Sequence, residues 1–155
     1  LIGPRSYRDV ALPFEKRLVE ALKSSVNVPV SLHICGNPTS ILADMASSGA
    51  DVLELDYPVD IREASRTIGP DIAIWGNIDP VGVLSHGTVD DVRRATRELL
   101  QIVDECGHDR FVISSGCTLA VETPPENLFM MFKTAREPRS ARPHKPSVDG
   151  AIKHV

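Results

Sequence analysis

The sequence predicts a parallel α/β domain made of four successive strand–helix units. Short apolar segments rich in β-branched residues alternate along the chain with longer segments whose apolar residues recur at helical spacing. The loops between these segments are short, which favours parallel strands joined by crossover helices. The chain has 155 residues, of which 42% are hydrophobic, and this is enough for one globular domain with its own core.

The first unit follows a helix at residues 9–25, where apolar residues recur at helical spacing. The β-rich run at 27–35 is predicted as the first strand. A second helix begins around Pro38, a residue type that suits the first helical turn, and ends at Gly49.

The second and third units repeat this order. The apolar run at 51–56 predicts a strand, and the segment 60–69, which ends in a glycine, predicts a short helix. A third strand is expected at 71–79. The pattern at 88–107 is typical of a long helix, because Thr88 can cap its start, aspartates occupy its first turn and a glycine ends it.

The fourth unit consists of a strand at 110–117 and a helix at 123–137 with proline at its start. The periodic pattern then stops. Residues 138–155 contain prolines and scattered basic residues without a period, which predicts a disordered tail. We therefore expect one domain at 1–137 followed by this tail.

Composition excludes several classes of function. The net charge of −4 is small and both signs are mixed along the chain, so binding to nucleic acid or to an anionic membrane is not expected. No apolar run approaches the ~18 residues that a membrane span needs. An odd and sparse set of three cysteines favours a reducing compartment, and we expect a cytoplasmic protein with free thiols.

Four strand–helix units are compatible with an open doubly wound sheet or with half of an eight-stranded barrel. A nucleotide-binding open sheet needs a glycine-rich turn after its first strand. The corresponding turn here, CGNPTS, contains a single glycine, so nucleotide binding is not expected.

Polar side chains gather where each predicted strand ends. In chain order they are His33 and Cys35, Glu54 and Asp56, Asn77 and Asp79, and the segment Ser114–Cys117. The carboxyl ends of parallel strands meet at one edge of a sheet, so these side chains should surround one mouth. Residues two apart in a strand also share a face, which aims His33 and Cys35 in the same direction.

The donors at this mouth predict a zinc site. His33, Cys35 and Cys117 would form a shell of two thiolates and one imidazole with a coordination position left open. A substrate thiol in that position would lose its proton and become a nucleophile at neutral pH. This chemistry favours alkyl transfer to sulfur over hydrolysis. The alternative is a core histidine bonded to a carbonyl group and two buried cysteines that pack as small hydrophobic residues.

Four other residues have weaker signals. Asn77 and Asp79 in the segment WGNIDP are interpreted either as substrate-binding residues or as residues that shape a turn. Trp75 is expected in the core. Cys106 lies before the fourth strand, at the opposite end from the mouth, and is expected to have no role in the site.

Three segments carry a resemblance to a known family. LHICGNPTSILADMASSGADVLELD, WGNIDPVGVLSHGT and FVISSGCTLAVETPPENL resemble the uroporphyrinogen decarboxylase superfamily. They are most similar to its zinc-dependent branch, the methylcobamide:thiol methyltransferases of the coenzyme M type, which carry His-x-Cys at one strand end and Gly-Cys at the last. The resemblance covers about residues 3–137 and implies the C-terminal half of a (βα)8 TIM barrel.

The resemblance implies zinc ligands at His33, Cys35 and Cys117. It also implies a carboxylate as fourth ligand of the resting site, for which Asp56 is the best match and Glu54 the second choice. The implied reaction moves a methyl group from a methylcobamide on a partner corrinoid protein to a thiol such as coenzyme M, or to a tetrahydrofolate.

Two alternatives stay open. One is uroporphyrinogen decarboxylase activity in tetrapyrrole biosynthesis, which in the family uses no metal and relies on residues of the N-terminal half. The other is an inactive fragment or a half-barrel interaction module. A full barrel needs about 250 residues, so we expect the chain to self-associate or to bind the N-terminal half that it lacks.

Overall fold

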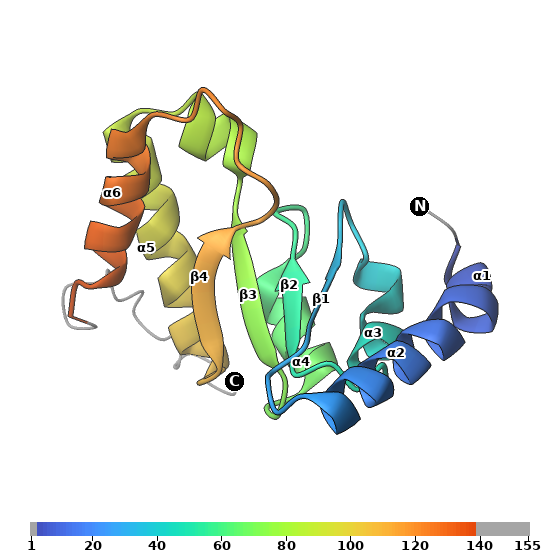
Figure 1. The fold of residues 1–155 in the computed structure, drawn as a ribbon. Helices are drawn as coiled ribbons and strands as arrows, with labels where there is room; N and C mark the ends of the chain where they lie inside the picture. The colour runs from blue at the N-terminus through green and yellow to red at the C-terminus, as the bar shows by residue number, and fades with distance from the viewer. Residues whose placement is uncertain (1–2, 139–155) are drawn as a thin grey trace, which may run out of the picture.

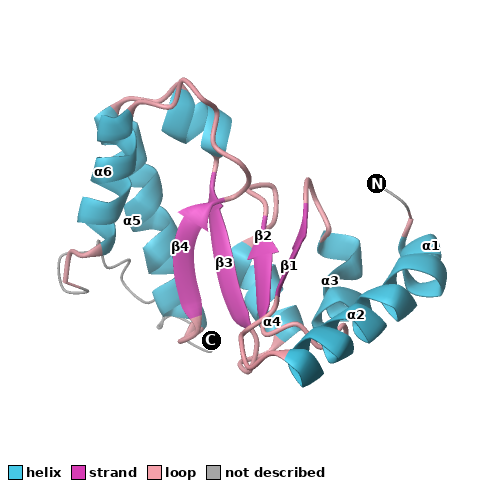
Figure 2. Cartoon of the chain, viewed as in Figure 1, coloured by secondary structure: helices cyan, strands magenta, loops and turns pink. Residues whose placement is uncertain are grey.

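The computed structural model describes residues 3–138 and confirms the parallel α/β arrangement (Figures 1 and 2). One sheet contains four strands in sequence order, and each neighbouring pair is parallel. The strands are β1 (Ser31–Ile34), β2 (Val52–Leu55), β3 (Ala73–Ile78) and β4 (Phe111–Ser115). Residues 139–155, nearly all of the predicted tail, lie outside the described part of the chain.

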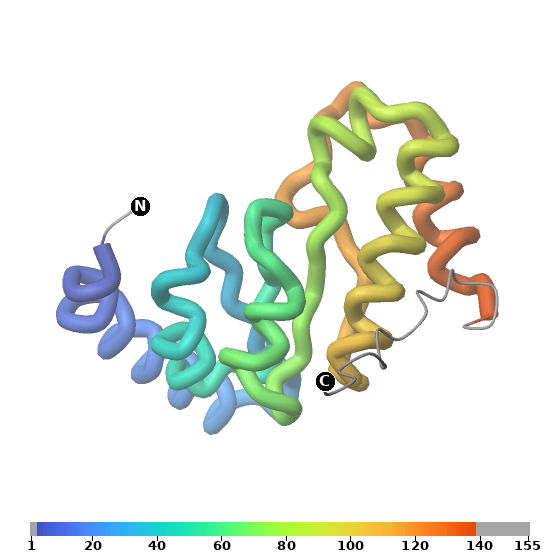
Figure 3. Tube along the Cα trace, turned by 180° about the vertical axis from the view of Figure 1, so that it is seen from behind, coloured from blue at the N-terminus to red at the C-terminus, as the bar shows by residue number. Residues whose placement is uncertain are grey.

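Helices cover one face of this sheet. In Figure 1, α4 and α5 lie behind the strands, and in the reversed view of Figure 3 they lie in front of them. The helices that follow the strands are α3 (Leu42–Ala46), α4 (Ile61–Ile68), α5 (Val89–Cys106) and α6 (Pro125–Ala135). Before β1 the chain forms α1 (Pro4–Ser6), a π-helical turn (Tyr7–Ala11) and α2 (Leu12–Ser25).

The helix ends follow from the predicted capping residues. The Thr88 hydroxyl accepts a hydrogen bond from the Asp91 N–H, and the Asp91 carboxylate accepts one from the Thr88 N–H. The Thr88 hydroxyl also donates to this carboxylate at 2.6 Å, and the two bonds that the carboxylate accepts from Thr88, together with one from Arg94, lower the pKa of Asp91 to about 2. Gly107 ends α5 in the left-handed region, with φ of 64°. The prediction for this helix is therefore confirmed at both ends.

Two helical segments depart from the sequence pattern. The first helix begins at Pro4 rather than at residue 9. A π-helical turn also forms at Pro80–Ser85, where the pattern assigns no helix. Asp79 caps this turn, because its carboxylate accepts the Val81 and Gly82 N–H groups at 2.9 Å. The turn is too short for a periodic pattern, so only the Asp-Pro start could have indicated it.

The core lies between the sheet and its helices. Leu53, Leu55 and Ile74 project from the strands and are completely buried, as are Val92 on α5 and Met45 on α3. These strand residues lie on the face of the sheet that the helices cover, and their burial explains why the strands are apolar in sequence.

The opposite face of the sheet is open. The strand register places His33, Glu54, Trp75 and Val112 in one row across this face. Trp75 and Val112 in this row are 38% and 47% exposed. The prediction that Trp75 lies in the core is therefore wrong, because its register puts it on the face opposite Ile74.

A second apolar surface runs along α2. Val10, Phe14, Leu18 and Leu22 recur every four residues and are all exposed, whereas Leu12 and Val19 of the same region are buried. Spacing of four residues aligns side chains on one helix face. Uncovered apolar surfaces of this kind mark interaction sites, so self-association or docking of a further chain stays a prediction. None of the helices in the described residues has the length and apolar character needed to cross a membrane.

A buried hydroxyl on α5 provides a test of how this helix packs. The side chain of Thr96 is fully buried, and its hydroxyl has no hydrogen-bond partner among the described residues. Thr96→Val keeps the shape and removes the unpaired polar group, so we expect a free energy of unfolding about 1 kcal/mol higher. Thermal unfolding followed by circular dichroism should show a midpoint about 2–4 °C higher for a chain of this size.

Thr88→Val is the matched control for this substitution. It makes the same chemical change at the helix cap, where the hydroxyl is bonded, and should lower the free energy of unfolding by about 1 kcal/mol. A midpoint that falls in Thr96→Val as it does in Thr88→Val would contradict the assignment of an unpaired hydroxyl.

Candidate metal centre

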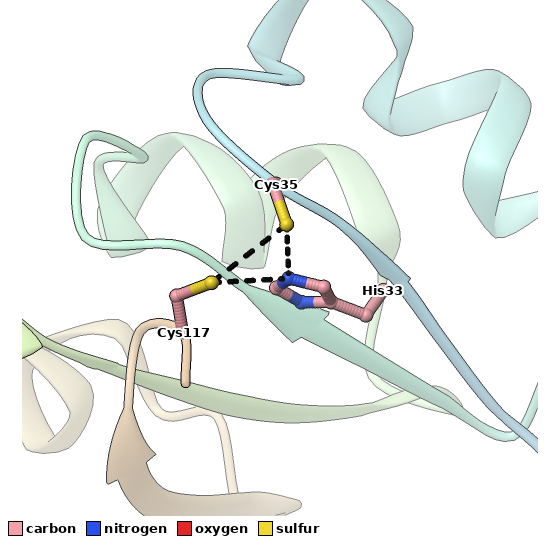
Figure 4. Close-up of side chains that lie close together, drawn as sticks. All are labelled: His33, Cys35 and Cys117. Atoms are coloured by element: carbon pink, nitrogen blue, oxygen red, sulfur yellow. Dashed lines mark hydrogen bonds between the residues drawn. The ribbon is translucent and has the colours of Figure 1, made fainter. Parts of the chain in front are cut away.

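An imidazole and two thiols meet at the carboxyl end of the sheet (Figure 4). The His33 Nε2 atom lies 3.2 Å from the Cys35 Sγ atom and 3.8 Å from the Cys117 Sγ atom. The two sulfurs are 3.7 Å apart, although their residues are 82 positions apart in the chain. The three residues that the sequence predicts as zinc ligands are therefore brought together.

The ends of the two edge strands of the sheet supply these donors. His33 lies within β1 on the open face, and Cys35 follows directly after this strand. Cys117 follows shortly after β4 and is directly preceded in the sequence by Gly116. A Cβ atom at Gly116 would lie 2.4 Å from the Tyr57 backbone nitrogen, so only glycine allows this segment to pass so close to the end of β2.

The hydrogen bonds of His33 fix how its ring faces the sulfurs. Its Nδ1 atom lies 3.0 Å from the backbone carbonyl oxygen of Glu54. A carbonyl oxygen can only accept, so Nδ1 is the donor in this bond, and in the neutral ring Nε2 presents its lone pair to the two thiols. Backbone carbonyls hold metal-binding histidines in this way in known metal sites. The Glu54 carboxylate lies near the same Nδ1 atom, at 3.9 Å.

The size of the donor triangle fits one zinc ion. Zinc in a tetrahedral site, with bonds of about 2.3 Å to sulfur and about 2.0–2.1 Å to nitrogen, separates two sulfurs by about 3.8 Å and a sulfur from a nitrogen by about 3.6 Å. The observed edges are 3.7 Å between the sulfurs and 3.2 and 3.8 Å from sulfur to nitrogen. Three protein donors of this kind leave one coordination position open for a substrate atom.

The exposure of the thiols disfavours the packing alternative. Cys35 is exposed and Cys117 is half-buried, and both are free thiols. A hydrogen bond with Cys117 and the negative charge of that thiolate raise the pKa of the Cys35 thiol, and the charge of Asp56 acts in the same direction. Two adjacent thiolates therefore repel each other, and a divalent cation between them removes this cost.

Neither carboxylate predicted as a fourth ligand belongs to the cluster. The donor atoms of the cluster lie within 4.8 Å of one another and come from His33, Cys35 and Cys117. Asp56 is buried, and its two carboxylate oxygens accept the N–H groups of Gly36 and Tyr57 at 2.7 and 2.8 Å. The sequence gives no signal for these contacts beyond the glycine that stands next to each cysteine.

Asn77 and Asp79 lie at the same end of the sheet but contact backbone groups. The Asn77 side-chain amide donates to the carbonyl groups of Asp56 and Val59 at 3.2 and 2.8 Å. Asp79 caps the turn after β3. With Tyr57 and residues of α5, both line a separate open cavity of about 230 Å³. Their role in substrate binding stays a prediction. Cys106, at the end of α5, is not part of the cluster, as expected.

Comparison with known sequences identifies relatives of two kinds. A model of the uroporphyrinogen decarboxylase (URO-D) family matches residues 1–138. The chain is 37% identical over 139 residues to the methylcobamide:CoM methyltransferase MtbA of Methanosarcina mazei, covering 90% of this chain and 39% of the relative. It is 33% identical over 144 residues to the uroporphyrinogen decarboxylase of Gloeobacter violaceus, covering 91% of this chain and 40% of the relative.

Comparison with solved structures gives the same extent of similarity. A methyltransferase from Methanosarcina mazei superimposes with a TM-score of 0.75 and 31% sequence identity, over 87% of this chain and 37% of the other. The four strand–helix units thus correspond to part of a TIM-barrel-like methyltransferase. The chain spans about two fifths of the length of the curated relatives that it matches.

Metal binding tests the assignment of the three donors. We expect the chain to bind one zinc ion, measured by competition with a chromogenic chelator and by elemental analysis. Cys35→Ser or Cys117→Ser should lower the affinity at least about 100-fold, the upper range seen when a residue next to the ligands is changed. Cys106→Ser removes the third thiol of the chain and should leave the affinity unchanged. Full zinc content and affinity in both Cys35→Ser and Cys117→Ser would refute the assignment.

Proposed function

This chain belongs to the uroporphyrinogen decarboxylase family, and we propose that it is the zinc-binding part of a methyltransferase that uses a methylated corrinoid protein and a small thiol. The observation that carries the proposal is the triangle formed by His33, Cys35 and Cys117. The similarity to a protein named methylcobamide:CoM methyltransferase supports it.

The residues of this centre suit the activation of a thiol. When bound, zinc supplies the positive charge that holds an acceptor thiol as its thiolate at neutral pH. Cys35 and Cys117 balance that charge, and His33 is held in one orientation by the Glu54 carbonyl group. With these three donors in place, the open position accepts one further sulfur ligand.

The open face of the sheet supplies the wall beside this centre. Trp75 and Val112 lie in the same row as His33 and present apolar surface. Inside a complete barrel, such a wall would limit the access of water to a bound thiol and strengthen the electrostatic interactions of the site. Acceptor candidates are coenzyme M and, as the second choice, a tetrahydrofolate.

Uroporphyrinogen decarboxylation is the second candidate. The similarity to the Gloeobacter violaceus enzyme favours it, since that relative is matched over the same share of this chain and nearly as closely. The decarboxylase chemistry has no use for two converging thiols, and we therefore rank it below methyl transfer. The chain spans about two fifths of either relative, so both activities need the remainder of a barrel. We also propose a cytoplasmic location.

Binding of a thiol to the metal-loaded chain tests the proposed function without the rest of the barrel. Coenzyme M should bind to the cobalt(II)-substituted chain and raise the sulfur-to-cobalt absorption in the near ultraviolet, because a third sulfur joins the shell. Isothermal titration in buffers of different ionisation enthalpy should show release of about one proton, as expected when a metal-bound thiol becomes a thiolate.

Isethionate, the hydroxyl analogue of coenzyme M, is the matched ligand control and should give neither signal. The Cys106→Ser variant should bind coenzyme M like the unchanged chain. Equal binding of isethionate, or absence of coenzyme M binding by a chain that holds its full cobalt content, would contradict thiol activation.

A further inference from the structure

We infer that Asp56 is a positioning residue that joins the two halves of the metal centre without being a ligand. The inference rests on the proposed metal centre. Asp56 follows β2, which lies beside β1, and its side chain is only 6% exposed. Its carboxylate thus lies between the segment that carries Cys35 and the segment that carries Cys117.

The first contact fixes the segment that carries Cys35. One carboxylate oxygen of Asp56 accepts the Gly36 N–H at 2.7 Å. Gly36 directly follows Cys35 and has φ of 82°, in the left-handed region that favours glycine. A hydrogen bond to a charged acceptor is about twice as strong as a neutral one. The bond therefore holds the turn that sets the direction of the Cys35 thiol.

The second contact fixes the segment that carries Cys117. The other carboxylate oxygen accepts the Tyr57 N–H at 2.8 Å. Gly116 packs against this same group, since a Cβ atom there would lie 3.1 Å from that oxygen and 2.4 Å from the Tyr57 nitrogen. The Gly116 N–H in turn donates to the Ile78 carbonyl oxygen at 2.8 Å. The position of Cys117 therefore depends on the conformation that Asp56 imposes on its own backbone.

Asn77 supports Asp56 from the neighbouring strand. Its side-chain amide donates to the carbonyl groups of Asp56 and Val59. Asp56 is thus held through both its main chain and its side chain. A residue fixed in this way can transmit its position to Gly36 and Gly116, and through them to the two sulfurs.

Zinc affinity of Asp56→Asn tests the inference. An asparagine offers one acceptor oxygen and one NH2 group that can only donate, so one of the two backbone N–H groups would face another N–H group. We expect zinc affinity to fall about 10–100-fold, the range for residues that orient metal ligands. At saturating cobalt(II), the absorption spectrum should equal that of the unchanged chain, because the ligands are the same.

Asp60→Asn is the matched control. Asp60 also accepts a backbone N–H, from Arg62 at 2.8 Å, at the start of α4. It contacts neither cysteine segment, so this variant should bind zinc as tightly as the unchanged chain.

Gly116→Ala tests the same contact from the other side without changing Asp56. It should also weaken zinc binding, because the added Cβ atom displaces the segment before Cys117. Circular dichroism of each metal-free variant checks that the fold is retained, and Gly116→Ala decides the matter if Asp56→Asn does not fold.

Three results would overturn the inference. They are unchanged zinc affinity in Asp56→Asn, unchanged affinity in Gly116→Ala, and a saturated cobalt(II) spectrum of Asp56→Asn that shows the loss of an oxygen ligand. Failure of the proposed function is distinguishable, because the unchanged chain would then bind no zinc, or would bind it equally well without Cys35 or Cys117.

Discussion

The parallel hydrogen-bond ladder of the four strands is the constraint on which the site depends. It brings the carboxyl ends of β1 and β4 to one edge of the sheet and sets which side chains share a row. His33 and Cys117 are 84 positions apart, and holding their atoms within bonding range of one ion has a large cost in chain entropy. The buried face of the sheet offsets that cost, since its apolar residues fix the strands before any ion binds. The metal centre can therefore be largely preformed in the folded chain.

The sequence was sufficient to predict features that depend on the periodicity of apolar residues or on the residue types at the ends of helices and strands. The apolar runs predicted the strands, Thr88 predicted the start of α5, and the polar residues at strand ends predicted the convergence of His33, Cys35 and Cys117. Contacts that depend on three-dimensional proximity could not be predicted in this way. The exposure of Trp75 follows from strand register, and the engagement of both Asp56 oxygens by backbone groups follows from loops that local propensity does not describe.

The family relationship explains why fold and chemistry must be argued separately. The decarboxylase and methyltransferase relatives match the same part of this chain with similar identity, so the scaffold is shared and does not choose between the reactions. What supports the choice is a set of side-chain donors. Two sulfurs and one lone pair of nitrogen, arranged with the spacing of a tetrahedral zinc site, are specific to soft-metal chemistry.

The position of Trp75 has a consequence for solution studies. The chain contains a single tryptophan, and this residue lies in the same row as His33, partly exposed on the open face of the sheet. Its fluorescence therefore originates from one known place close to the metal centre. A corrinoid absorbs strongly in the near ultraviolet, so a cobalamin docked against this face would quench the indole emission by energy transfer. Quenching of Trp75 fluorescence in the unlabelled chain would therefore report how closely a bound corrinoid approaches the sulfur donors.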